Sequence, residues 1–166
     1  MAVHALLLLA LTGLLACDDT PTNPDPDVPV SVGVVAVDEH NLPVVILEEQ
    51  GGARSLPIWI GAAEAHSIAA EMKRKPALRP NTHDLANQLI QGLEGEIVRV
   101  VVNELHNGTY FATMVLISRG ETVDIDARPS DAIAIALRAD APIFVRASLL
   151  DGERSEPVVD RAEQRI

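Results

Sequence analysis

Residues 56–69 read LPIWIGAAEAHSIA, and residues 123–136 read VDIDARPSDAIAIA. In both segments a short alternating run typical of a β-strand leads into a run of alanine and isoleucine that favours a helix. The two segments are displaced by 67 positions, and the same displacement lays residues 30–72 over 97–139 without a gap. Only six positions are identical in that overlay, so the matching order of elements carries more weight than identity. The pattern predicts that one structural unit occurs twice.

Each copy of the unit is expected to contain three strands and then a helix. The first copy has its strands near 28–37, 44–48 and 56–60 and its helix at 62–73. The second copy has its strands near 96–103, 109–117 and 122–127 and its helix at 129–138. The fold class is therefore α+β: a duplicated β-β-β-α unit whose tight turns favour a mainly antiparallel, bent or barrel-like sheet packed with short helices.

A further helix is expected between the two copies, and a last strand is expected at 142–147. Thr82 is the predicted N-cap of this middle helix, because a hydroxyl can accept hydrogen bonds from the first free amides. The leucine and isoleucine side chains of the helix recur at helical spacing, which predicts that they face the core. These residues are Leu85, Leu89, Ile90 and Leu93.

The N-terminal residues predict export. Residues 5–16 form an uncharged apolar run, which is too short to span a membrane and suits a signal peptide. The run ends Leu-Leu-Ala-Cys, which resembles the lipobox of bacterial lipoproteins, and Cys17 is the only cysteine. We expect Cys17 to be lipidated, the alternative being a free thiol. The protein would then lie in the bacterial cell envelope, anchored to the membrane by its lipid on the exported side.

The chain divides into four predicted segments. A signal peptide occupies residues 1–16, and a polar tether rich in aspartate and proline occupies 17–29. A single domain follows at 30–150, and a polar tail closes the chain at 151–166. The net charge is −11, whereas proteins that bind nucleic acid are usually basic, because phosphate contacts require Lys and Arg. The charge weighs against a polynucleotide substrate.

Four strings of this sequence stand in a recognisable order. They are LPIWIGAAEAHSIA at 56–69, RPNTHDL at 79–85, IDARPSDAIAIALR at 125–138 and PIFV at 142–145. In order and approximate spacing they resemble the bifunctional nuclease (BFN) domain family. The resemblance spans about residues 30–150 and implies nuclease activity on both RNA and DNA. It implies no settled set of catalytic residues.

The acidic residues near the second repeat's helix are candidates for the chemistry. Asp124 and Asp126 are two positions apart in a predicted strand, so both point to the same face. With Asp131 at the next helix start, they could bind a divalent metal such as Mg²⁺ or Mn²⁺, which polarises phosphate and activates water. The repeat lays Glu64 over Asp131, so Glu64 could contribute a ligand. In the alternative, these aspartates are the solvated face of a strand whose core-facing residues are Val123, Ile125 and Ala127.

Two arginines precede predicted helix starts. Proline holds Arg79 and Arg128 extended, and both guanidinium groups could bind phosphate. The alternative is capping together with an Arg–Asp pair that stabilises the fold. The only basic cluster adjoins Arg79 and could follow a phosphate backbone, or it could simply be solvated; it contains Lys73, Arg74 and Lys75.

His83 and Trp59 complete the candidates. His83 could transfer a proton in catalysis, or it could be a surface or capping residue. Trp59 could stack on a base, although packing against a helix or another subunit is favoured. Two functions remain open at this point. One is a metal-assisted nuclease with an RNA or DNA substrate. The other is a non-catalytic binding or assembly module, which could form a homo-oligomer.

Overall fold

The computed structural model describes residues 25–75 and 78–152. The predicted signal peptide, Cys17 and most of the tether lie outside these ranges, as does the tail beyond residue 152. Among the described residues, no helix is both long and apolar enough to span a membrane.

The two copies of the unit form as predicted. The first copy consists of β1 (Asp27–Val37), β2 (Pro43–Glu49), β3 (Ser55–Trp59) and α1 (Ala62–Met72). The second copy consists of β4 (Gly95–His106), β5 (Thr109–Ser118), β6 (Glu121–Ala127) and α3 (Pro129–Arg138). Outside the copies lie α2 (Thr82–Gly92), β7 (Ile143–Arg146) and α4 (Ala147–Gly152). The short helix α4 was not predicted.

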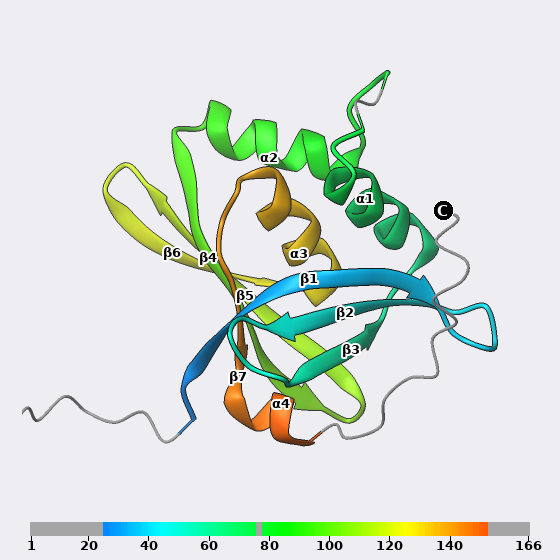
Figure 1. Ribbon diagram of the computed structural model, residues 1–166. Helices are drawn as coiled ribbons and strands as arrows, with labels where there is room; N and C mark the ends of the chain where they lie inside the picture. Colours follow the sequence, from blue (N-terminus) through cyan, green and yellow to red (C-terminus); the bar gives the residue numbers. More distant parts are fainter. Residues whose placement is uncertain (1–24, 76–77, 153–166) are drawn as a thin grey trace, which may run out of the picture.

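The seven strands of the described residues form one sheet in the order β3-β2-β1-β7-β4-β5-β6. Every neighbouring pair is antiparallel except β4 and β7, which are parallel. The strand β7 therefore joins the two copies at the centre, and β3 and β6 are the edges (Figure 1). The edges β3 and β6 do not pair with each other, so the sheet is open. It is bent, as predicted, but it does not close into a barrel.

Strand pairing supports the duplication independently of sequence identity. Val34 of β1 pairs with Ile46 of β2, and Val101 of β4 pairs with Thr113 of β5. Each member of the second pair lies 67 positions after its counterpart, which is the displacement found in the sequence. The same backbone register has thus formed twice in one chain.

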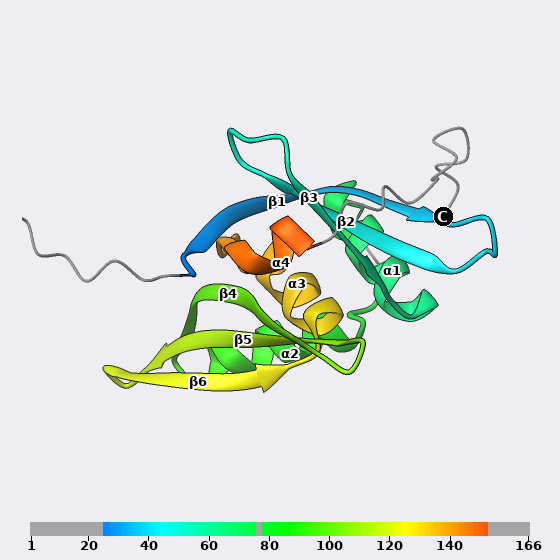
Figure 2. The same cartoon turned by 90° about the horizontal axis from the view of Figure 1, so that it is seen from below.

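The core lies where α3 meets both halves of the sheet. Figure 2 shows β1–β3 on one side of α3 and β4–β6 on the other. Ala132, Ile133, Ala134 and Ala136 of α3 are fully buried, and they belong to one apolar cluster with residues of both halves. Alanine on one face of α3 permits close contact with α1, which packs against it. This packing brings the N-terminal ends of α1 and α3 together.

Several expectations about boundaries and burial were wrong. Strand β1 starts at Asp27, one residue before the predicted start, and so includes the last residues of the segment assigned to the tether. The N-cap of α2 is Asn81 and not Thr82. Leu85 and Leu89 of α2 and its C-cap residue Leu93 face solvent, and they are 51%, 56% and 67% exposed.

The apolar residues of β6 also differ from the expectation for a half-buried strand. Val123 and Ile125 are 43% and 39% exposed. Their cross-strand partners on β5, Leu116 and Met114, are buried. Since β6 is an edge strand, its apolar face extends beyond the part of the sheet that the helices cover.

Candidate functional site

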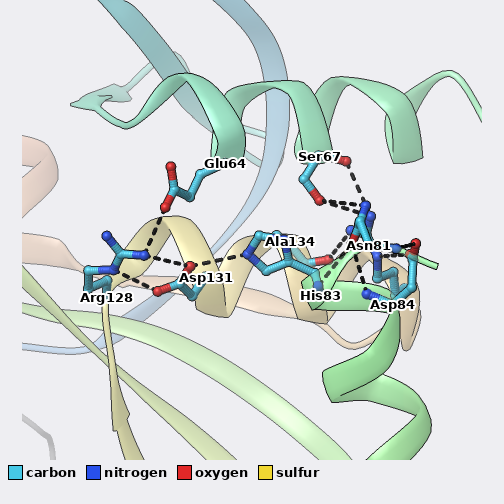
Figure 3. A network of polar contacts seen from close by, with 9 residues as sticks. Glu64, Ser67, Asn81, His83, Asp84, Arg128, Asp131 and Ala134 are labelled. Carbon is cyan, nitrogen blue, oxygen red and sulfur yellow. Dashed lines mark hydrogen bonds and ion pairs between the residues drawn. The ribbon is translucent and has the colours of Figure 1, made fainter. Parts of the chain in front are cut away.

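Four of the predicted site residues meet at the N-terminal ends of three helices (Figure 3). Arg128 donates from Nε to Asp131 Oδ2 at 2.7 Å and from Nη2 to Asp131 Oδ1 at 3.1 Å. Its Nη2 also donates to Oε1 of Glu64 at 2.8 Å. The Nε2 atom of His83 lies 3.1 Å from Oδ1 of Asp131. We call Glu64, His83, Arg128 and Asp131 the Arg128 cluster.

The local sequence explains why Arg128 stands at the head of α3. Arg128 is the N-cap residue, with extended dihedrals of φ −66° and ψ 140°, and Pro129 follows as the first helical residue. A residue before proline avoids the helical region, so the helix cannot extend backward. No side chain of the described residues caps the helix. The Arg128 side chain folds over its own first turn and binds Asp131 three residues on, so the alternative's Arg–Asp pair forms without its capping.

The two carboxylates bound to Arg128 are equivalent in the repeat. Glu64 lies in the first turn of α1 and Asp131 in the first turn of α3, and they are 67 positions apart. The residue equivalent to Arg128 is Gly61, the N-cap of α1. A β-carbon at Gly61 would overlap the Glu64 carboxylate. The glycine therefore leaves space for Glu64 to reach across to the second copy.

Mutual contacts keep Asp131 and Arg128 in their charged forms. Partial burial raises the pKa of the Asp131 carboxyl, but hydrogen bonds from Arg128 and His83 outweigh it, and the net pKa lies below its usual value. The same Asp131 contact, followed by that of Glu64, raises the pKa of Arg128. The Arg128 side chain is 68% exposed, whereas Glu64 and Asp131 are 15% and 28% exposed. A cation thus covers two partly buried anions and faces solvent.

His83 is held by the capping of α2. The Asn81 side chain accepts from the backbone amides of His83 and Asp84 at 2.9 and 3.0 Å. Asp84 in turn accepts from the Asn81 amide at 2.7 Å, which completes a capping box. The His83 side chain is 11% exposed, so its ring is mostly enclosed where it meets Asp131. Sequence reasoning identified His83 but not the box that orients it.

A second ion pair fastens α2 to the rest of the fold. Arg138 of α3 donates from Nε to Oδ1 of Asp84 at 2.5 Å, and from Nη2 to Oγ of Ser67 at 2.9 Å. Asn81 also donates to the same Ser67 oxygen at 3.2 Å. The Arg138 side chain is only 5% exposed. The pair involving Asp84 therefore uses Arg138 rather than Arg79, which lies exposed before α2.

The structure does not bring Asp124 and Asp126 into the Arg128 cluster. They lie exposed on the edge strand β6, opposite Val115 and Thr113 of β5. Within residues 25–75 and 78–152, no three His, Cys, Asp or Glu side chains are grouped so that they could bind a metal ion. The predicted ligand set Asp124, Asp126, Asp131 and Glu64 is thus divided between two places, and only Glu64 and Asp131 share a partner.

The predicted basic cluster lies at the other end of α1. Lys73 is the C-cap of that helix, and Arg74 and Lys75 follow it. Glu64 lies in the first turn, and the helix has 11 residues, so its two ends are about 16 Å apart. These lysine and arginine side chains therefore do not join the Arg128 cluster. A bound strand would have to extend along α1 to contact both.

A cavity of about 410 Å³ opens beside Arg128. Arg128, Pro129 and Ser130 form part of its wall, and the rest comes from both copies of the unit. The contributing residues are Leu42, Ile58, Trp59, Ile60, Gly61, Gly108, Thr109 and Tyr110. Sequence reasoning singled out Trp59 but missed Tyr110 and Leu42. They lie beside hairpin turns, and only the fold shows which turns meet.

The residues of the Arg128 cluster lie within the part of the chain that is similar to known proteins. The family described as the bifunctional nuclease domain matches residues 45–157. An uncharacterized protein of Mycobacterium tuberculosis is 40% identical over 119 residues, which cover 72% of this chain and 71% of that protein.

Two plant proteins are also similar. Bifunctional nuclease 2 of Oryza sativa subsp. japonica is 32% identical over 119 residues, and bifunctional nuclease 1 of Arabidopsis thaliana is 32% identical over 118. Each match covers 68% of this chain but only 37% and 36% of the plant proteins. The family match covers more than half of the chain and includes all of the Arg128 cluster. The chain therefore belongs to the bifunctional nuclease domain family.

Proposed function

We propose that this chain is a nuclease that hydrolyses phosphodiester bonds of RNA and DNA at the Arg128 cluster. The observation that carries the proposal is the exposed guanidinium of Arg128, held beside the enclosed His83–Asp131 pair. Family membership supports the activity, since the plant relatives carry the name bifunctional nuclease.

Arg128 is suited to hold a non-bridging phosphate oxygen. Its hydrogen bonds to described residues use Nε and Nη2, and none of them uses Nη1. An arginine can therefore keep its two carboxylates and still offer donors to phosphate. These donors would stabilise the negative charge that develops on the phosphate oxygens during hydrolysis, which lowers the barrier.

His83 and Asp131 are suited to move the proton. If Asp131 accepts from the Nε2–H group of His83, the tautomer is fixed and Nδ1 is left to accept a proton. We propose that Nδ1 takes the proton from the attacking water as its oxygen bonds to phosphorus and the bond to the leaving oxygen breaks. Asp131 stabilises the imidazolium, as a carboxylate does beside a catalytic histidine, and the imidazolium then gives the proton to the leaving oxygen.

Metal assistance is a separate proposal. Mg²⁺ and Mn²⁺ prefer oxygen ligands, and the close pair of carboxylates is Glu64 and Asp131. Arg128 already bridges these two carboxylates, so they do not fit a resident metal ion as ligands. No step of the mechanism above uses a metal ion. Cleavage should be compared after dialysis against EDTA and after adding back either ion. Activity that returns only with the ion supports metal assistance, and activity unaffected by EDTA rejects it.

Labelled single-stranded RNA and DNA test the nuclease itself. We expect Asp131→Asn to abolish cleavage, because it weakens both the grip on Arg128 and the orientation of His83. Asp126→Asn is the matched variant, since it removes one carboxylate from β6. Loss of cleavage in Asp126→Asn but not in Asp131→Asn would place the centre on β6. Binding without cleavage by the unaltered chain would favour the non-catalytic binding module, which the net charge of −11 also favours.

We also propose the lipid anchor at Cys17 and the exported location. The support is the apolar run at 5–16 and the solitary cysteine that ends it. Cys17→Ser should leave the chain unprocessed by lipoprotein signal peptidase and unlabelled by a palmitate analogue in cells. Labelling equal to that of the unaltered chain would reject the anchor. A homo-oligomer is a further proposal, which sedimentation of the purified chain would decide.

A further inference from the structure

The cavity beside Arg128 combines an aromatic wall with a neighbouring cation. Trp59 is 46% exposed although tryptophan usually buries most of its surface, and Tyr110 lines the same cavity. Ile58 and Ile60 add apolar surface, and Arg128 forms part of the wall. At about 410 Å³ the cavity lies within the usual range for small-ligand sites.

The orientation of Trp59 is set before any ligand arrives. Its Nε1–H group donates to Oδ2 of Asp38 at 3.0 Å. The other oxygen of that carboxylate accepts from the amides of His40 and Leu42, both at 2.9 Å. Hydrogen bonds from Leu42 and then Trp59 hold the pKa of Asp38 below its usual value. One ionised carboxylate therefore positions both the indole ring and the turn that brings Leu42 to the cavity.

The charges around the cavity select what can enter it. Asp38 and Glu64 are acidic, and their carboxylates lie next to residues of the wall. The indole has already used its only donor, so its remaining surface offers apolar contact and stacking. A flat, uncharged aromatic group suits this wall better than an anion does. An anionic group attached to that ring would be directed to Arg128, the cation in the lining.

We infer that this cavity binds one unpaired base of a single-stranded nucleic acid, with Trp59 as the stacking residue and Arg128 on the adjoining phosphate. A base in a duplex is stacked and paired, so it cannot insert without being extruded, whereas a single strand presents its bases freely. Proteins that bind single strands combine aromatic side chains that stack on bases with cations that contact the backbone, and here Trp59 and Arg128 would supply one of each. The inference rests on the proposed nuclease function and names the form of its substrate.

The chain contains a single tryptophan, so its fluorescence reports on this cavity alone. The full chain should be titrated with a phosphorothioate-linked thymidine hexamer, which resists hydrolysis. We expect saturable quenching by the hexamer and none by a blunt duplex of the same length. An abasic hexamer keeps the phosphates and removes the bases, so it should not quench either. Equal quenching by the abasic strand, or by the duplex, would overturn the inference.

Variants separate stacking from folding. With a labelled hexamer, Trp59→Leu should weaken binding about tenfold in anisotropy measurements, the order expected when one stacked base is lost. Trp59→Phe keeps an aromatic ring and should retain most of the affinity. If it does, a loss of binding in Trp59→Leu is due to the lost ring and not to misfolding. Phe111 is the control, because it is exposed on the same strand as Tyr110 and does not line the cavity. Phe111→Leu should bind normally, and an equal loss there would count against a specific base site.

The base site and the nuclease activity can each fail without the other, and the experiments tell the two failures apart. Quenching by the hexamer without cleavage of any strand supports the base site and removes the proposed activity. Cleavage without quenching leaves the nuclease standing and rejects Trp59 as the base-binding residue.

Discussion

At the scale of single residues, position 128 breaks the symmetry of the duplicated unit. Gly61 and Arg128 occupy the same N-cap position, yet only the second carries a side chain. The glycine admits the Glu64 carboxylate, and the arginine binds it together with Asp131. One substitution between equivalent positions thus creates a charged centre where two related helices meet.

The first prediction concerns that arginine. Arg128→Lys keeps the charge but loses the planar fork that binds two carboxylates and phosphate together. We expect kcat/KM for single-stranded RNA and DNA to fall on the order of a hundredfold, as when one donor to a developing anion is removed. Arg119→Lys is the control, because Arg119 lies exposed in the turn between β5 and β6. Similar rates for both variants would remove Arg128 from the reaction.

Acid stability provides the second prediction at this scale. Burial raises the pKa of Asp84, but hydrogen bonds from Asn81 and Arg138 outweigh it, so the folded-state pKa is lowered. A lowered carboxyl pKa stabilises the fold fully above the unfolded value of about 3.9, and this contribution is lost as pH falls through the folded value. The unaltered chain should therefore lose stability below about pH 4.

Asp84→Asn measures this contribution directly. At pH 7 we expect a cost of about 2 kcal/mol in the free energy of urea unfolding, because a hydrogen bond between charged groups is lost beside the buried Arg138. As pH falls through the lowered folded-state pKa of Asp84 the two curves should converge, because the unaltered carboxyl is then protonated as well. A difference that stays constant as pH is lowered from 7 into the acid range would show that Asp84 acts through packing rather than charge.

At the scale of elements, the sequence predicts that α2 forms but does not predict which of its faces is buried. The helix itself and its acidic first turn follow from local signals. The face it buries does not, because Leu85, Leu89 and Leu93 recur at the spacing of a core-facing stripe and yet are exposed. Ala86 and Ile90 are the residues of α2 that pack against the core. Which stripe is buried depends on how the Asp84–Arg138 pair turns the helix.

The third prediction compares neighbours on α2. Ile90→Ala should cost about 1 to 2 kcal/mol, because it removes partly buried apolar surface that packs against the core. Leu89→Ala should cost less than about 0.5 kcal/mol, since more than half of the leucine is already in water. Urea unfolding of both variants gives the two values. Equal large losses would mean that Leu89 is covered in solution, as it would be in the proposed homo-oligomer.

The same contrast explains how far the site could be predicted. Residues acting within one segment were recognisable, because Arg128 and Asp131 lie three apart at a helix start and Glu64 is their counterpart in the repeat. The ligand role of Asp124 and Asp126 rested on their closeness to Asp131 in sequence, and it ignored that an edge strand can diverge from the helix it precedes. The cavity required the fold, since its wall comes from turns of both copies.

At the scale of the whole molecule, two units share one core through α3 and β7. The pairing of β7 with both β1 and β4 closes the gap between the copies. The contact of α1 with α3 places two helix starts side by side. Each unit alone would leave its helix covered by only half of the sheet. It would also contain only part of the Arg128 cluster. The duplication therefore provides the core and the candidate site together.

The last prediction concerns the path of a bound strand on an acidic molecule. The net charge is −11, so binding of a nucleic acid strand depends on local cations. Among the described residues near the site, these are Arg128 in the site and the basic cluster of Lys73, Arg74 and Lys75 at the C-terminal end of α1. A strand that contacts both must extend about 16 Å along the helix, so a dinucleotide is too short to reach the basic cluster and a dodecamer is long enough.

The Lys73/Arg74/Lys75 triple alanine variant should therefore bind a dinucleotide normally and a dodecamer more weakly. For the dodecamer, the slope of log Kd against log salt should fall by about 2, which corresponds to three lost phosphate contacts on a single strand. An unchanged slope, or equal losses for both lengths, would mean that the strand takes another path across the molecule.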